Sequence, residues 1–456
     1  MLEHHLRNMA IEEHDSCGII CAVQKDGIPS NDNVQQIVRA LVQMQHRAGF
    51  VDGEGDGCGI QLDIPRKLWA KKLTRQGVPG VLADDSRFVV AHMFIPGGEV
   101  ANADVWMERV REYFADRSID VLVEQVGNVR SEALGPRGRA DEPIFWQIAA
   151  MCRVEDVTLV GNQLFALQML IERETPVHFL SFSQHIVVYK VRGSASALPA
   201  YFPDLDNKDC RAVVSIGHNR YSTNTSTIFE RVQPFSILGH NGEINTIQKL
   251  REESEILGFQ LVPGGSDSQD MNRTIEGLIH QYGLSLYEAM EMIFPPIVNE
   301  IKQFRPELQN LYMFYRAAWG PYAQGPAGIV SRYADQCVFS VDALGLRPLW
   351  FVETDTTLFF SSEQGVVSLK DIVSNPKTLA PGEKIGVLLH RGEPTEVLEY
   401  HELQNRVLGL SATRFDLGHF SDSLGFGASS VELSVDEPVT LFGDATHDAA
   451  AEERAL

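Results

Sequence analysis

A single cysteine stands between a run of acidic residues and a short apolar stretch in "EEHDSCGII", residues 12–20. Cys17 is either a small core residue or a nucleophile, because a thiolate can attack a carbonyl carbon and form a covalent intermediate. The other cysteines are scattered along the chain and form no CxxC pair, so neither a disulfide framework nor a zinc site is indicated. We therefore expect reduced thiols and no metal site.

Two further stretches place polar groups directly after apolar strands, where binding sites are often built. "GHNRYSTNTS" (217–226) contains Arg220, whose guanidinium offers a fork of donors for a carboxylate. "ILGHNGEINT" (237–246) contains Asn241 and Gly242, a side-chain amide beside an unhindered backbone N–H, which suits an oxyanion hole. Each stretch on its own is equally consistent with a turn whose side chains are satisfied locally.

A third stretch, "PGGSDSQD" (263–270), places Asp267 on a glycine-rich loop just before a predicted helix. Asp267 is either the cap of that helix or a carboxylate that receives a ligand ammonium. The sequence therefore offers groups for a carboxylate, an ammonium, an oxyanion and a nucleophilic attack. An α-amino acid with a reactive side-chain carbonyl would use all four.

The glycines of "GEGDGCG" (53–59) raise the alternative of a phosphate-binding loop. Their spacing does not fit G-x-G-x-x-G, and the loop also carries Glu54 and Asp56, which would repel a phosphate. A tight turn is the favoured interpretation.

Strands and helices that could position these residues are interleaved along the chain. "CGIICAV" (17–23) is typical of a buried strand, and apolar residues at helical spacing follow over 33–47, with Asp32 and Gln35 spaced as a capping box. Four short runs rich in Val, Phe and Trp over 327–361 predict one antiparallel meander. The remaining predictions are a strand at 87–95, a strand pair at 178–190, and helices at 101–116, at 271–282 and after Ser285.

Composition and charge limit the classes of function that the chain can have. With 456 residues, 44% hydrophobic and 22% charged, the chain is globular in composition. The net charge of -22 argues against nucleic acid or an anionic membrane surface as the main partner. No apolar run approaches the ~20 residues of a membrane span, and the polar N-terminus lacks the apolar region of a secretory signal, so we expect a cytoplasmic protein. Residues 406–456 are predicted to be an acidic flexible or docking tail.

The motifs, in their order along the chain, resemble the class II glutamine amidotransferase domain at the N-terminus of the glutamate synthase large subunit. The matches run from Cys17 to about residue 405: "DSCGI", "MQHR", "GDGCGI", "ALGP", "RYSTNT", "HNGEINT", "SDS", "GLRP" and "SSE". The resemblance implies an α+β fold, the four-layer αββα sandwich of the N-terminal nucleophile hydrolases. It also implies one such domain over residues 17–405.

The resemblance implies that the mature chain begins at Cys17 and that residues 1–16 are a propeptide. A base must take the thiol proton, and the motif offers only the cysteine's own α-amino group, whose reference pKa of about 7.7 to 8.0 lies near working pH. An amide nitrogen inside a chain is not basic. The leader must therefore be removed before the enzyme can work.

The resemblance also implies roles in catalysis and substrate binding for the residues that match the family motifs. Asn241, through its side chain, and Gly242, through its backbone N–H, match the oxyanion hole. Arg220 matches the arginine that binds the substrate α-carboxylate, and Thr223 lies beside it in the same motif. Asp267 matches the acid that receives the substrate α-ammonium.

Arg47 matches the arginine that helps to position the nucleophile end, and the chain departs from the family directly after it. Ala48 in "HRAG" stands where the family has a glycine, with its unrestricted φ. Glutamate synthases also continue into flavin-, iron–sulfur- and 2-oxoglutarate-binding regions, and no cysteine cluster for an iron–sulfur centre is present here. We therefore expect no cofactor in this chain, and FMN and iron–sulfur on a partner subunit.

The resemblance implies a glutamine amidotransferase subunit that hydrolyses L-glutamine to L-glutamate and ammonia through a Cys17 glutamyl thioester. Ammonia would pass to a separate flavin-containing synthase subunit, as in a split glutamate synthase. The alternatives are the amidotransferase subunit of an N-methylglutamate synthase-like enzyme, a stand-alone amidase, and a glutamine-binding regulatory protein without catalysis. A regulatory protein would have no use for the thiol or the oxyanion residues.

Overall fold

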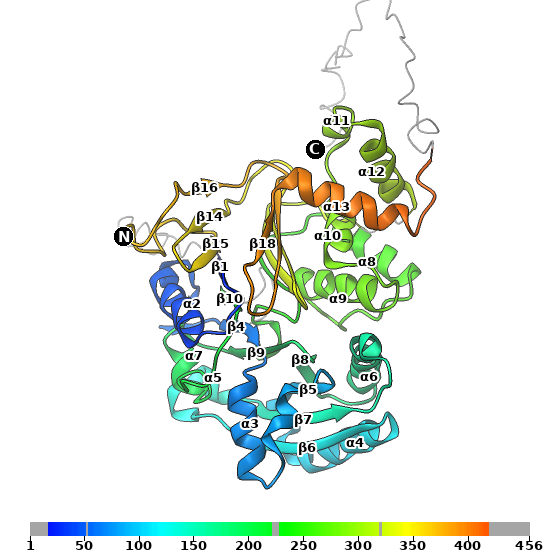
Figure 1. Ribbon diagram of the computed structural model, residues 1–456. Helices are drawn as coiled ribbons and strands as arrows, with labels where there is room; N and C mark the ends of the chain where they lie inside the picture. The colour runs from blue at the N-terminus through cyan, green and yellow to red at the C-terminus, as the bar shows by residue number, and fades with distance from the viewer. Residues whose placement is uncertain (1–16, 52, 221–227, 319–321, 419–456) are drawn as a thin grey trace, which may run out of the picture.

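The computed structural model describes residues 17–51, 53–220, 228–318 and 322–418, and its strands form three larger antiparallel sheets (Figure 1). The first sheet has the strand order β16 (Lys377–Thr378), β14 (Trp350–Glu353), β15 (Thr357–Ser361), β1 (Gly18–Gln24), β10 (Val214–Asn219), β4 (Cys58–Asp63) and β9 (Ile186–Val191). The second has the order β11 (Leu238–Gly242), β12 (Ala327–Tyr333), β13 (Gln336–Val341), β17 (Lys384–Leu388) and β18 (Glu396–Leu398). The third has the order β6 (Ile119–Val126), β7 (Ile144–Cys152), β5 (Phe88–Ile95) and β8 (His178–Ser183), and a small ribbon pairs β2 (Phe50–Val51) with β3 (Glu54–Gly55).

The first and second sheets pack face to face, with β1 in the middle of the first sheet. Ile19 and Cys21 of β1 belong to the core between the two sheets, where Phe339 of β13 stacks on Phe360 of β15. The alternate residue Ile20 belongs to the core on the opposite face, beneath α2 (Asn31–Gln43). Because both faces of β1 are covered, its sequence is a continuous apolar run without alternation.

Helices cover the outer faces of the two stacked sheets (Figure 1). On the second sheet these helices are α8 (Ile247–Ile256), α9 (Asp267–His280), α10 (Leu286–Ile293), α12 (Pro306–Ala318) and α13 (Tyr400–Ala412), with the short α11 (Val298–Ile301) beside them. The order helix, sheet, sheet, helix is the expected αββα arrangement. The predicted α+β fold class is therefore confirmed.

The third sheet was not anticipated as a separate layer. It lies below the stacked sheets in the view of Figure 1, with α4 (Ala103–Asp116) and α6 (Val160–Glu174) packed on one face. The remaining helices of this half are α3 (Arg66–Arg75), α5 (Pro136–Ala140) and α7 (Ala197–Tyr201). The predicted strand pair at 178–190 is divided, because β8 joins the third sheet while β9 joins the first.

The single meander predicted over residues 327–361 is wrong. β12 and β13 form a hairpin in the second sheet, whereas β14 and β15 form a hairpin in the first. The connection between the two hairpins crosses from one sheet to the other. Each hairpin has the expected strand pattern, but the choice of sheet depends on partners far away in the sequence.

Two predicted helix starts have different outcomes. The cap of α2 is Ser30, whose side chain accepts a hydrogen bond from the backbone three residues on, so the predicted Asp32–Gln35 capping box is wrong. Ser30 is extended and directly precedes the first helical residue, where a hydroxyl reaches the orphan N–H groups. The helix predicted after Ser285 is confirmed: α10 begins there with a capping box formed by Ser285 and Glu288.

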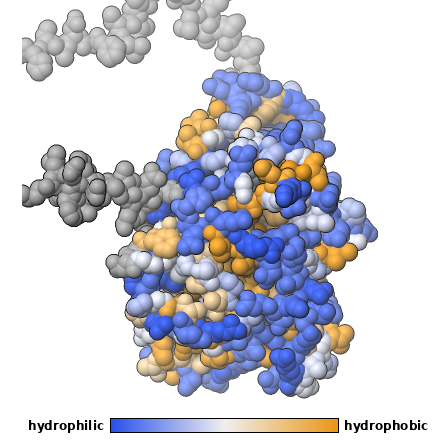
Figure 2. All heavy atoms as spheres, turned by 90° about the vertical axis from the view of Figure 1, so that its left-hand side faces the viewer, coloured by the Kyte–Doolittle hydropathy of each residue, from blue (hydrophilic) through white to orange (hydrophobic). Residues whose placement is uncertain are grey.

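The ends of the chain are only partly described. α13 crosses the expected domain end at residue 405 and continues to Ala412, with Val407 buried. The proposed leader, 1–16, and the tail beyond residue 418 lie outside the described residues, so their roles stay predictions. No helix among the described residues combines the length and the apolar character needed to span a membrane. One face of the molecule is mostly hydrophilic (Figure 2), which agrees with the strong net charge.

Candidate active site

Cys17 lies directly before β1 and is only 3% exposed. The first residue of β1, Gly18, pairs with Asn219, the last residue of the antiparallel strand β10. The start of β1 and the end of β10 therefore lie side by side. This register places the predicted nucleophile next to Arg220.

Arg220 has an unusual backbone conformation, with φ of 103°. Its N–H donates to the carbonyl oxygen of Gly57 at 2.7 Å, and its Nε donates to Oδ2 of Asp56 at 3.2 Å. A non-glycine residue at positive φ costs on the order of 1–3 kcal/mol, and such residues cluster at functional sites. The turn gives the buried guanidinium one fixed direction.

Asp56 holds this guanidinium from within the "GEGDGCG" stretch. Burial raises the pKa of Asp56 to about 6, although Arg220 acts in the opposite direction. Gly49 packs against the carboxylate so closely that a Cβ atom there would lie 2.0 Å from Oδ2 of Asp56. The stretch thus places a carboxylate beside an arginine, which agrees with a tight turn and not with a phosphate-binding loop.

We expect Asp56→Asn to remove a pH dependence of stability. The folded-state pKa of about 6 lies above the ordinary value of 3.8, so the folded chain binds this proton more tightly than the unfolded chain. The contribution of this proton to the free energy of unfolding is complete below the unfolded-state pKa and is lost as the pH rises through the folded-state pKa. The free energy of unfolding should therefore fall by about 1.4 kcal/mol between about pH 5 and about pH 7.5. Chemical denaturation at the two pH values measures this loss. Asp355→Asn, at an exposed aspartate, should keep it; an unchanged loss in Asp56→Asn would refute the assignment.

Asn241 and Gly242 end β11, in the second sheet. Asn241 is 5% exposed, and its Oδ1 has no hydrogen-bond partner among the described residues. Gly242 has φ of 138°, and a Cβ atom there would lie 1.8 Å from the carbonyl oxygen of Pro326, so only glycine fits. A buried amide oxygen without a partner is costly in a core and is typical of a binding site.

Asp267 is the first residue of α9 but not its cap. The N-cap is Ser266, which exchanges hydrogen bonds with Gln269 in a capping box. Oδ1 of Asp267 accepts a hydrogen bond at 2.6 Å from the backbone N–H of Ser268, and Oδ2 accepts one at 3.1 Å from the backbone N–H of Ile244, two residues after Gly242. Ser266 occupies the N-cap, so the helix-cap interpretation of Asp267 is wrong, and the carboxylate joins the first turn of α9 to the loop that follows β11.

Arg47 lies beside the nucleophile end of β1. A Cβ atom at Gly18 would be 3.6 Å from Cβ of Arg47, and Nε of Arg47 lies 2.6 Å from Oε1 of Glu363 in an ion pair. Ala48 has φ of -78° and ψ of 145°, a conformation that any residue adopts. The departure from the family at Ala48 therefore leaves the backbone unstrained.

Two buried polar residues of β10 were missed by the sequence analysis. Nδ1 of His218 lies 2.9 Å from the carbonyl oxygen of Arg220, and Nε2 lies 2.9 Å from the carbonyl oxygen of His240 on β11. Burial lowers the pKa of His218 to about 4. The side chain of Asn219 donates to the carbonyl oxygen of Leu41 at 2.7 Å. Consecutive polar residues at the end of an apolar strand were the available signal, because buried polar groups need partners.

Three strand ends thus meet at one place between the stacked sheets. Cys17 precedes β1, Arg220 follows β10, and His218 joins β10 to the strand of Asn241. Thr223, the other predicted carboxylate contact, falls within 221–227, outside the described residues. In the described part of the chain, no three His, Cys, Asp or Glu side chains lie together as metal ligands.

Comparison with solved structures finds a glutamine phosphoribosylpyrophosphate amidotransferase from B. subtilis, complexed with ADP and GMP. The match has a TM-score of 0.40 and 13% sequence identity, and it covers 84% of this chain and 49% of that chain. A second match, titled as the allosteric regulatory enzyme of purine biosynthesis, has a TM-score of 0.41 and 12% identity over the same shares.

Sequence comparison finds longer proteins. "Ferredoxin-dependent glutamate synthase 2" of Synechocystis sp. is 29% identical, over 83% of this chain and 26% of that protein. "Ferredoxin-dependent glutamate synthase 1" of Arabidopsis thaliana is 30% identical, over 87% and 26%, and "Glutamate synthase [NADH]" of Saccharomyces cerevisiae is 27% identical, over 84% and 19%. The chain thus spans about a quarter of these relatives' length, or less. The family model for class II glutamine amidotransferases matches residues 17–409, beginning at the predicted nucleophile, and the chain belongs to this family.

Proposed function

We propose that the chain hydrolyses L-glutamine to L-glutamate and ammonia, with Cys17 as the nucleophile. The observation that carries the proposal is the meeting of a thiol, a strained buried arginine and an oxyanion-type pair at the ends of three neighbouring strands. These groups match what an amide of an α-amino acid requires. The family assignment supports the same reaction.

The reaction begins on a chain from which residues 1–16 have been removed. The α-amino group of Cys17 takes the thiol proton, and the thiolate attacks the amide carbon of glutamine. The side-chain amide of Asn241 and the N–H of Gly242 bind the resulting oxyanion. The C–N bond then breaks, ammonia leaves with the proton from the α-ammonium group, and a glutamyl thioester remains. Water cleaves the thioester, giving glutamate and the thiol.

Substrate binding uses the two charged ends of glutamine. Arg220 binds the α-carboxylate through a guanidinium that Asp56 holds at Nε, with Thr223 beside it. Asp267 binds the α-ammonium, and its contact with the N–H of Ile244 couples that end of the substrate to the oxyanion loop. Arg47 supports the nucleophile end.

We further propose that ammonia passes to a separate synthase subunit that carries FMN and iron–sulfur, as in a split glutamate synthase with 2-oxoglutarate as the acceptor. The similarity to glutamate synthases supports an acceptor reaction of the glutamate synthase type. Glutamine hydrolysis itself uses only protein groups of this chain. The cytoplasm is the proposed location.

The proposed substrate is tested with protein that begins at Cys17. We expect glutamate and ammonia to be released from glutamine in equal amounts, and Asp267→Asn to raise KM by about 10- to 100-fold, because one charge-assisted contact is lost. Asparagine keeps one oxygen that can accept from the N–H of Ile244. Asp104→Asn, in the first turn of α4, is the matched control and should leave KM unchanged. An unaltered KM in Asp267→Asn would remove Asp267 from the substrate site.

A further inference from the structure

The turn after β13 displays two leucines to solvent. Leu344 is 69% exposed and Leu346 is 57% exposed. Both carboxylate oxygens of Asp342 accept hydrogen bonds within this turn, from the N–H groups of Leu344, Leu346 and Arg347. These hydrogen bonds fix the turn with both leucine side chains exposed, and we call it the leucine turn (342–346).

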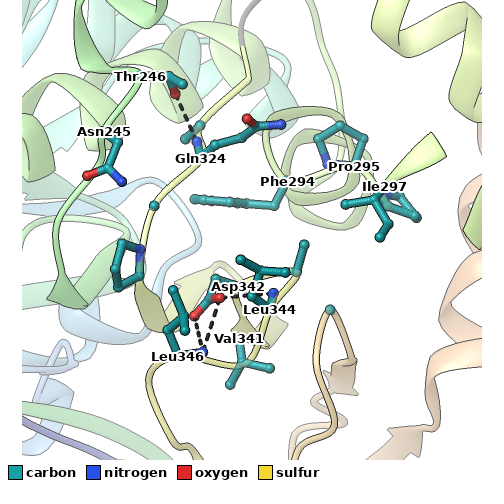
Figure 3. A pocket seen from close by; sticks show the side chains of 16 residues that line it. Asn245, Thr246, Phe294, Pro295, Ile297, Gln324, Val341, Asp342, Leu344 and Leu346 are labelled. Atoms are coloured by element: carbon teal, nitrogen blue, oxygen red, sulfur yellow. Dashed lines mark hydrogen bonds between the residues drawn. The ribbon is translucent and has the colours of Figure 1, made fainter. Parts of the chain in front are cut away.

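A cavity of about 380 Å³ lies behind the leucine turn and is lined mainly by apolar side chains. Figure 3 shows the side chain of Phe294 between the leucine turn and the contact that joins Thr246 to Gln324. Ile297 lines the same cavity from the segment before α11. An apolar cavity edged by exposed leucines has the features of an interaction surface for a protein.

The wall of this cavity is hydrogen-bonded to the segment that directly follows Gly242 at the end of β11. The carbonyl oxygen of Pro326 accepts a hydrogen bond at 2.9 Å from the N–H of Glu243, and the carbonyl oxygen of Gln324 accepts one at 2.8 Å from the N–H of Asn245. Pro326 is also the residue that excludes any side chain at Gly242. A molecule seated in the cavity would touch the segment that fixes the backbone of Gly242.

We propose that the cavity and the leucine turn are the docking surface for the synthase subunit, with an apolar side chain of that subunit in the cavity. The inference rests on the proposed function. The synthase subunit of the proposed function needs a surface on this chain that lies close to the site of ammonia release, and the cavity is bonded to the segment after Gly242. A small ligand would use the cavity alone, whereas the leucines extend the apolar surface outside it. A docked subunit would also lie next to the strand where ammonia is released.

The test uses full-length tagged chain isolated from its native host, with Leu344→Asp/Leu346→Asp compared with Val105→Asp/Leu159→Asp. Val105 on α4 is 64% exposed and Leu159, directly before α6, is 48% exposed; both helices pack on the third sheet, which lies below the stacked sheets in Figure 1. We expect wild type and control to co-isolate a flavin-absorbing subunit that forms glutamate from glutamine and 2-oxoglutarate. The amount of that subunit co-isolated with the leucine-turn variant should be at least about ten-fold lower than with wild type. The variant's own rate of glutamine hydrolysis should equal that of the isolated wild-type chain.

The outcomes separate the two proposals. If the leucine-turn variant keeps the flavin-absorbing subunit, the docking surface is elsewhere while the split synthase stands. If the variant instead changes the mass of the isolated chain from oligomer to monomer, the surface binds a second copy and the inference is wrong. If wild type hydrolyses glutamine but brings no flavin-absorbing subunit, the split-synthase function fails and the inference fails with it.

Discussion

Protein that keeps residues 1–16 is expected to release no glutamate from glutamine, and protein that begins at Cys17 is expected to be active. The reason is the missing base: a peptide nitrogen cannot take the thiol proton, whereas a free α-amino group can. Intact-mass measurement paired with a glutaminase assay on each preparation tests this exclusion. Cys17→Ala should abolish hydrolysis and keep glutamine binding.

Cys21→Ala is the matched control for this prediction. Cys21 is fully buried between the stacked sheets, and burial raises the pKa of its thiol, so its loss should lower stability and leave hydrolysis intact. A diazo or chloroketone analogue of glutamine should label Cys17 alone, because reactivity follows thiolate character. Burial raises the pKa of every other cysteine: Cys21, Cys58, Cys152, Cys210 and Cys337. Robust activity from a chain shown to retain its leader would refute the mechanism.

Asn241→Ala is expected to lower kcat by about 10²- to 10³-fold, with little change in KM. The amide of Asn241 would act on the charge that develops after attack, so its loss should raise the barrier without weakening the binding of glutamine. Steady-state kinetics on the processed chain separate the two constants. Asn405→Ala, at an exposed asparagine of α13, should change neither. A raised KM with unchanged kcat would make Asn241 a binding residue instead.

Local sequence patterns were enough to identify the strands that carry the candidate site. Cys17, Arg220 and Asn241 each lie at the end of a strand that the apolar runs predicted. The start of α10 after Ser285 was also predicted, and the two partners of its capping box lie within one turn. What these features share is that a short window contains all the interacting groups.

The features that were missed depend on contacts between distant parts of the chain. Sheet membership of the four strands over 327–361 is decided by β1 and β11, which come much earlier in the sequence. His218 and Asn219 were passed over because their partners lie on other elements. The cap of α2 was assigned wrongly for a different reason, since Ser30 and Asp32 compete for the same orphan N–H groups and only the backbone conformation decides.

His218 makes the site depend on the whole fold. Its ring, on β10 of the first sheet, contacts the carbonyl oxygen of Arg220 and that of His240, which precedes Asn241 on β11 of the second sheet. A newly synthesised polypeptide in which the sheets have not yet closed on each other therefore has the thiol but not the aligned arginine and oxyanion strand. Such a chain cannot hydrolyse glutamine, so activity begins only after the two sheets have packed together.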